Sequence, residues 1–133
     1  METTLCQHLE NYYKGAYMKI AFTSTGTGWD AKIDPRFGRT EFILIYDEEK
    51  DELTSIDNRN IVNIAHGAGP KTAQIIFDQA PQVLITGNGP GGNAAGVLAR
   101  MNLKILIGAA GMTINEAYEA FKNNKLQQGG ENA

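Results

Sequence analysis

The sequence predicts one α/β domain, a mixed five-stranded sheet with helices on its faces. Three observations lead to this prediction: continuous apolar runs, apolar residues at helical spacing between the later runs, and short clusters of glycine where the pattern changes. The 133 residues are 42% hydrophobic and 20% charged, as in a single globular domain. A chain of this length buries enough surface to fold without a disulfide or a structural metal.

Three strands are expected first. Residues 19–23 and 42–47 are apolar runs rich in β-forming side chains, and the second is continuous enough to be covered on both faces. The acidic segment 47–51 is too polar to bury and predicts a hairpin loop. It leads into residues 52–57, a more polar strand that we place at an edge of the sheet.

Helices and strands then alternate. Apolar stripes at helical spacing predict helices around residues 73–80, 94–101 and 114–121. Apolar runs at 83–86 and 105–107 predict buried strands between them. The order along the chain is therefore β-β-β-α-β-α-β-α, and right-handed crossovers place the helices on the faces of the sheet. A capping box of the form T-x-x-E precedes the last stripe.

The domain itself is expected to span residues 18–126. Residues 1–17 form a polar N-terminal extension of undetermined order, and the polar residues 127–133 predict a flexible tail. The single cysteine, Cys6, lies in the extension. This chain alone therefore offers neither a disulfide nor a four-cysteine iron–sulfur site.

Charge and hydropathy exclude two broad classes of function. The net charge is −3, so no broad basic surface is expected to neutralise the phosphates of a nucleic acid. No apolar run approaches the length of a membrane span, and the N-terminus lacks the pattern of a signal peptide. We expect a cytoplasmic protein that binds neither nucleic acid nor membrane.

The glycines predict the position of a site. They gather at strand-to-helix turns and helix starts, which share one edge of an open α/β sheet where ligands tend to bind. Without Cβ atoms, and with unpaired helix N–H groups nearby, this edge suits an anion. The site residues predicted from these clusters are Gly67, Gly69, Gly87, Asn88, Gly89, Gly91, Gly92 and Gly111.

Other interpretations of the glycines remain open. Residues 87–92 match G-x-G-x-x-G, but they follow a late strand, contain Pro90, and are followed by no acid for a ribose hydroxyl. The same glycines could serve only tight turns and close packing of helices on strands. No P-loop is present, the strands carry no carboxylates for two-metal hydrolysis, and no serine has a G-x-S-x-G context. We therefore predict no catalytic residue.

Two polar features complete the predicted site. The segment 34–39 forms a loop between the first two strands, and its guanidinium groups could hold an anion. An Asp-Pro turn with solvated arginines and a core phenylalanine is an equally open interpretation. His66 precedes the first helix, where an imidazole could bind a soft metal centre or be only a polar turn residue. The loop residues concerned are Arg36, Phe37, Gly38 and Arg39.

In combination these motifs resemble the dinitrogenase iron-molybdenum cofactor biosynthesis family, which includes the NifX and NafY accessory proteins and the C-terminal part of NifB. The resemblance covers about residues 18–126, with every block in order. The blocks are D-P-R-F-G-R at 34–39, H-G-A-G at 66–69, G-N-G-P at 87–90, G-A-A-G at 108–111 and T-I-N-E-A at 113–117.

The resemblance implies a ribonuclease H-like, three-layer α/β/α fold without ribonuclease activity. It also implies a non-enzymatic carrier of an anionic metal–sulfur cluster, similar to the iron–molybdenum cofactor or a precursor of it. Mapped onto this sequence, His66 would help to hold the metal, with Arg36 or Arg39 and backbone N–H groups as partners. Because the domain lacks a cysteine, we expect weak, exchangeable binding.

The expected partners are the cluster or an oxoanion, and a protein that donates or accepts the cluster. Such a role could also lie outside nitrogen fixation. The main alternative is a regulatory or protein-interaction module of the same fold that uses no cofactor. A nucleotide-binding enzyme is a further alternative.

Overall fold

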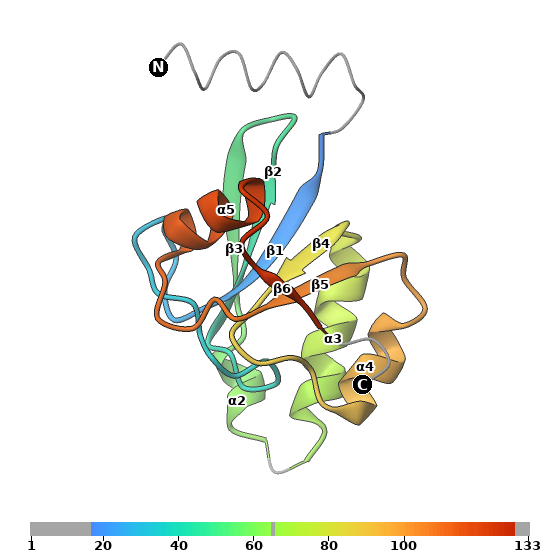
Figure 1. Ribbon diagram of the computed structural model, residues 1–133. Coiled ribbons are helices and arrows are strands. Elements are labelled where there is room, and N and C mark those ends of the chain that lie inside the picture. Colours follow the sequence, from blue (N-terminus) through green and yellow to red (C-terminus); the bar gives the residue numbers. More distant parts are fainter. Residues whose placement is uncertain (1–16, 65, 130–133) are drawn as a thin grey trace.

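A mixed six-stranded sheet lies at the centre of the computed structural model (Figure 1). The structure describes residues 17–64 and 66–129. The predicted α/β class and mixed sheet are confirmed. The strands are β1 (Lys19–Ser24), β2 (Phe42–Asp47), β3 (Glu52–Asp57), β4 (Val83–Ile85), β5 (Lys104–Ile107) and β6 (Gln127–Gln128). The helices among the described residues are α2 (Arg59–Val62), α3 (Ala68–Gln79), α4 (Gly92–Leu98) and α5 (Ile114–Lys122).

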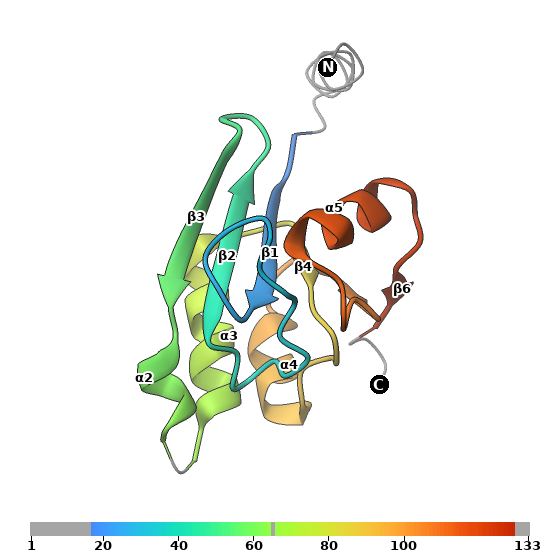
Figure 2. The same ribbon diagram turned by 90° about the vertical axis from the view of Figure 1, so that its left-hand side faces the viewer.

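The strand order is β3-β2-β1-β4-β5-β6, with β1 near the middle. β1 pairs antiparallel with β2, and β2 pairs antiparallel with β3 in the expected hairpin (Figure 2). On its other side β1 runs parallel to β4, which runs parallel to β5. The carboxyl ends of β1, β4 and β5 therefore meet at one edge of the sheet, as the position of the glycines predicted.

Helices cover both faces of the sheet and give three layers (Figure 1). On one face Phe22 and Leu44 belong to a buried cluster with Ile114 of α5. On the other face Ile45 and Leu84 belong to a second cluster, to which α3 and α4 contribute. Neighbouring residues of one strand enter opposite clusters because their side chains alternate across the sheet. The continuous apolar run of β2 follows from burial on both faces.

The sheet has one strand more than the five predicted. The sixth strand, Gln127–Gln128, pairs antiparallel with β5, and the Gly129 N–H donates a 2.9 Å hydrogen bond to the carbonyl of Ile105. Both glutamines are exposed. A two-residue polar strand held by backbone bonds alone leaves no apolar alternation in the sequence. The one-turn helix α2, which carries no side-chain cap, was not predicted either.

The capping box predicted before the last helix is present. Thr113 Oγ1 accepts a hydrogen bond from the Glu116 N–H, and Glu116 Oε1 accepts one from the Thr113 N–H. The predictions made for residues 1–16 and for 130–133 fall outside the described residues. Within the described part of the chain, no helix is both long enough and apolar enough to cross a membrane.

Candidate functional site

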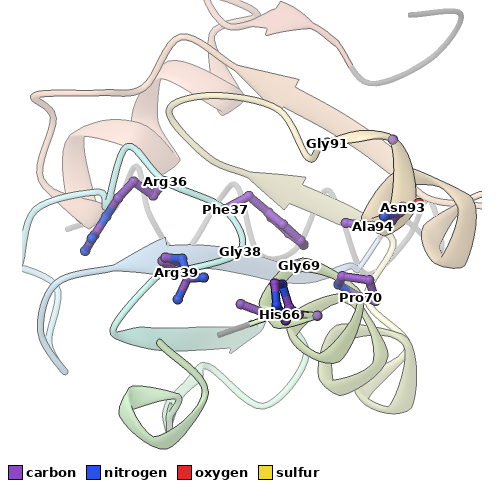
Figure 3. A pocket seen from close by; sticks show the side chains of 13 residues that line it. Arg36, Phe37, Gly38, Arg39, His66, Gly69, Pro70, Gly91, Asn93 and Ala94 are labelled. Carbon is purple, nitrogen blue, oxygen red and sulfur yellow. The ribbon is translucent and has the colours of Figure 1, made fainter. Parts of the chain in front are cut away.

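A pocket of about 500 Å³ opens where the loop between β1 and β2 meets the starts of α3 and α4 (Figure 3). Three segments line it, residues 36–39, 66–70 and 91–94. The volume lies within the usual range for small-molecule sites. The pocket thus joins three segments that are far apart in the sequence, at the edge of the sheet where the parallel strands end.

Nine of the predicted site residues line this pocket together. Their role as ligand contacts remains a prediction. They are Arg36, Phe37, Gly38, Arg39, His66, Gly67, Gly69, Gly91 and Gly92. Four further lining residues, Ala68, Pro70, Asn93 and Ala94, were not predicted. All four belong to the first turns of α3 and α4, so counting onward from each glycine cluster into the helix would have found them.

Four other predicted site residues lie outside the lining. A Cβ on Gly87 would come within 2.7 Å of the Pro35 Cα, and the Asn88 N–H donates to the carbonyl of Pro35. Gly87 thus allows close packing against the arginine loop, the residues 34–41 that carry Arg36 and Arg39. Close packing was the alternative interpretation of the glycines. Gly111 has a positive φ of 89°, which explains the glycine there as a turn residue. Gly89 is exposed.

Asp34 ties both ends of the arginine loop together. Its Oδ1 accepts hydrogen bonds from the N–H and the Nε of Arg36, and its Oδ2 accepts from Nη2 of Arg36 and from the N–H of Glu41. The Asp34 side chain is only 1% exposed. The sequence predicts only a turn at Asp34 and gives no sign that the residue supports the site.

The two arginines of the loop differ in their surroundings. Arg36 forms an ion pair with Asp34 at 3.2 Å, and this bond raises the pKa of Arg36. In Figure 3 its side chain extends away from His66, whereas Phe37 points toward the pocket. Arg39 donates from Nη1 to the carbonyl of Ile64 at 3.2 Å. Phe37 is buried and also belongs to the core cluster beneath α3 and α4.

A buried hydrogen-bond network holds the loop against α3. Thr72 Oγ1 donates to the carbonyl of Gly38, and Asn58 Nδ2 donates to Thr72 Oγ1 and to the carbonyl of Thr40. Asn58 and Thr72 are fully buried. Neither residue was predicted, because a polar residue after a strand and a threonine inside a helix carry no local sign of this contact.

The start of α3 lines the pocket. Gly67 takes a left-handed conformation at the N-cap, and no side chain caps this end. The first N–H groups of a helix have no partner within the helix and carry a partial positive charge. His66 stands next to Gly67 and is exposed. The side chains and backbone here suit an anion.

The donor set does not suit a bare metal ion. Within residues 17–64 and 66–129, no three histidine, cysteine, aspartate or glutamate side chains come together. The lining offers one imidazole, two guanidinium groups and backbone N–H groups. Such a set fits a preformed anion that brings its own metal ligands, since a single imidazole can then complete its coordination.

Fold and pocket together define a small α/β protein with a pocket at helix starts, lined by basic side chains. The chain belongs to the dinitrogenase iron-molybdenum cofactor family, whose model matches residues 18–124. No match was found among curated proteins.

Solved structures show the same fold. The apo form of the orange protein from Desulfovibrio gigas is 30% identical, with a TM-score of 0.77, and the alignment covers 84% of this chain and 92% of that one. The Thermotoga protein TM1290, described as a candidate NifB protein of the DUF35 family, is 30% identical with a TM-score of 0.72 over the same shares. A third structure, PH0822, shares the fold at 20% identity and a TM-score of 0.64, with 84% and 96% covered.

Proposed function

We propose that this protein binds and carries an anionic metal–sulfur cluster, similar to the iron–molybdenum cofactor or a precursor of it. The observation that carries the proposal is the convergence of His66, the arginine loop and the uncapped start of α3 on one pocket. Membership of the iron-molybdenum cofactor family supports the choice of ligand class.

The chemistry of the lining supports a cluster rather than a small ion. A pocket of about 500 Å³ is far larger than a single hydrated oxoanion needs, and Phe37 and Ala94 give it apolar walls. No cysteine lines it. The cluster would therefore be held by charge, hydrogen bonds and one imidazole, which favours exchangeable binding and suits a carrier that passes its cargo to another protein.

Each group has a separate part in binding. The N–H groups at the start of α3 and the guanidinium of Arg39 supply positive potential for the anion. His66 offers a ring nitrogen to one metal of the cluster. The glycines leave the surface close to the ligand free of side chains, and the ring of Phe37 excludes part of the water. Binding of this kind requires no catalytic group.

The test uses anaerobically purified protein titrated with tetrathiomolybdate, a defined anionic metal–sulfur probe. We expect a visible absorption change that saturates, and co-elution of molybdenum with the protein on gel filtration. His66→Ala is expected to weaken binding by about tenfold, equivalent to about 1.4 kcal/mol. His8→Ala is the matched control, because the chain has two histidines and His8 lies in the extension.

Each alternative predicts a different result. Molybdate binding as tightly as tetrathiomolybdate would point to an oxoanion site, and saturable binding of a nucleotide would point to a nucleotide-binding enzyme. If neither tetrathiomolybdate nor molybdate binds the unaltered protein, the carrier proposal is wrong. An interaction module without cofactor then becomes the better hypothesis. If His66→Ala binds as well as the unaltered protein, the anchor is wrongly assigned.

A further inference from the structure

The buried carboxylate of Asp34 needs hydrogen-bond donors and a counter-ion from the arginine loop. The Asp34 carboxylate is 1% exposed and is paired with Arg36, which lines the candidate pocket. A carboxylate at this depth is strongly unfavourable unless it is hydrogen-bonded and its charge is balanced. Four hydrogen bonds meet the first need, two from backbone N–H groups and two from the guanidinium of Arg36. Arg36 alone among these donors carries a positive charge.

Arg36 is already engaged in this pair. Its Nε and Nη2, the two nitrogens of one guanidinium edge, lie 3.2 and 3.3 Å from the two oxygens of Asp34. Two parallel bonds of this kind fix the orientation of the guanidinium plane. The side chain extends away from His66 (Figure 3). If Arg36 turned into the pocket, Asp34 would be left as a buried charge without a counter-ion.

The same carboxylate determines the shape of the loop. It binds the N–H of Arg36 near one end and the N–H of Glu41 at the other. The segment between them carries Phe37, Gly38 and Arg39 on the pocket wall. A substitution at Asp34 is therefore expected to change the backbone conformation of this segment and so the position of its lining residues.

We propose that Asp34 and Arg36 are a positioning pair, in which Asp34 holds both ends of the loop and Arg36 balances its charge instead of contacting the anion. This inference deepens the proposed function and rests on it. It separates the roles of the two arginines, both of which line the pocket: Arg36 is engaged by Asp34 and acts on the ligand only through that carboxylate, whereas Arg39 does not bond to Asp34.

The test compares the effect of Asp34→Asn on tetrathiomolybdate affinity in three backgrounds: the unaltered protein, Arg36→Gln and Arg39→Gln. Arg36→Gln alone is expected to weaken binding, because it leaves an unbalanced negative charge beside the anion. Adding Asp34→Asn to Arg36→Gln should then restore affinity. This gain should be about tenfold larger than the change in affinity that Asp34→Asn causes in the unaltered protein or in Arg39→Gln, since such coupling marks residues that act together. Arg39→Gln is the matched control from the same loop.

Two outcomes would overturn the inference while leaving the proposed function intact. The first is an equal effect of Asp34→Asn in all three backgrounds, which would mean that Arg36 contacts the anion on its own. The second comes from nuclear magnetic resonance of the unaltered protein, which needs no variant to fold. We expect the Arg36 Nε–H signal to stay in place on adding tetrathiomolybdate while the amide signals of Gly38 and Gly69 move. A shift confined to Arg36 would contradict the assigned roles.

A measurement without ligand tests the part of Asp34 by itself. In the anion-free protein, Asp34→Asn should speed hydrogen exchange at the amides of Arg36 and Glu41 by about tenfold or more, because the charge-assisted bonds that protect them are weakened. Unchanged exchange at both amides would overturn the role of Asp34, even if the unaltered protein bound no probe and the proposed function had failed separately.

Discussion

Gly38 in the arginine loop lies directly against Gly69 in the first turn of α3. A Cβ on Gly38 would come within 2.9 Å of the Gly69 Cα and 3.0 Å of its backbone nitrogen. Both neighbouring atoms belong to the backbone and cannot turn aside like the end of a side chain. The contact between these two glycines therefore sets how closely the loop approaches the start of the helix.

Replacing Gly38 by alanine should separate the loop from α3. We expect Gly38→Ala to lower the free energy of unfolding by about 1–3 kcal/mol, the usual cost of forcing extra atoms into a packed site. Tetrathiomolybdate binding should weaken as well, because both sides of the contact line the pocket. Urea denaturation and the absorption titration measure the two effects.

Gly96→Ala is the control, since Gly96 lies inside α4 with nothing within 4 Å of an added Cβ. Alanine there should stabilise the protein, by up to about 1 kcal/mol, because glycine is a poor helix former. Equal and small effects of the two substitutions would show that the contact at Gly38 is not tight.

The sheet and the position of the site follow from local patterns. The run 42–47 is apolar without alternation because β2 is buried on both faces, and this pattern is visible in the sequence. The glycines at 67 and 91 mark helix starts whose common edge is set by the direction of the parallel strands. Both predictions depend only on short segments and on general rules of α/β topology.

The supports of the site could not be predicted in this way. Asn58 reaches Thr72 across 14 positions of sequence, and Thr72 reaches the carbonyl of Gly38 across 34. Such bonds depend on tertiary placement, and each partner is an ordinary polar residue in its own segment. Asp34 is similar, because D-P reads as a turn and only burial shows that the carboxylate needs a counter-ion.

The capping box at the start of α5 gives a second test of stability. Thr113→Ala removes the acceptor for the Glu116 N–H and is expected to lower the free energy of unfolding by about 1 kcal/mol. Thr113→Ser keeps a hydroxyl in the same place and should lose much less. Urea denaturation of both variants makes the comparison. An equal loss in both would mean that the methyl group, and not the cap, stabilises this end.

Asp57 and Arg59 form an exposed ion pair. We expect this pair to shift the pKa of Asp57 but to add little to the free energy of unfolding. Arg59 donates to both carboxylate oxygens of Asp57, and these bonds lower the pKa of Asp57 to about 2. The native state therefore favours the charged carboxylate, and this contribution is lost as the pH falls from about 4 toward 2. A carboxyl titration by nuclear magnetic resonance should find the low pKa. Arg59→Gln should raise it part of the way to the ordinary value, because the backbone N–H of residue 59 still donates to Asp57. An unchanged midpoint in the variant would contradict the pairing.

Glu48 joins the β2–β3 hairpin to two other parts of the fold. It is 3% exposed, so the prediction that the segment 47–51 is too polar to bury is wrong at this residue. Its carboxylate can be buried because it accepts hydrogen bonds from the Tyr118 hydroxyl at 2.5 Å and from the Met18 N–H at 3.0 Å. Burial, and then the bond to Glu48, raise the pKa of Tyr118 above its ordinary value. Tyr46 makes a similar bond to Asp51, but that carboxylate is exposed and can be hydrated.

Tyr118→Phe should therefore cost more stability than Tyr46→Phe, by about 1–3 kcal/mol near neutral pH, because it leaves a buried carboxylate oxygen without its donor. The pH dependence follows from the raised pKa: the native state prefers neutral Tyr118, so its contribution is complete below about pH 10 and is lost as the pH rises further. Urea denaturation between about pH 8 and 11 should give a shallower alkaline loss for Tyr118→Phe than for the unaltered protein. If both proteins lose stability equally with rising pH, the pKa of Tyr118 is not raised in the native state and its bond to Glu48 does not favour the neutral form.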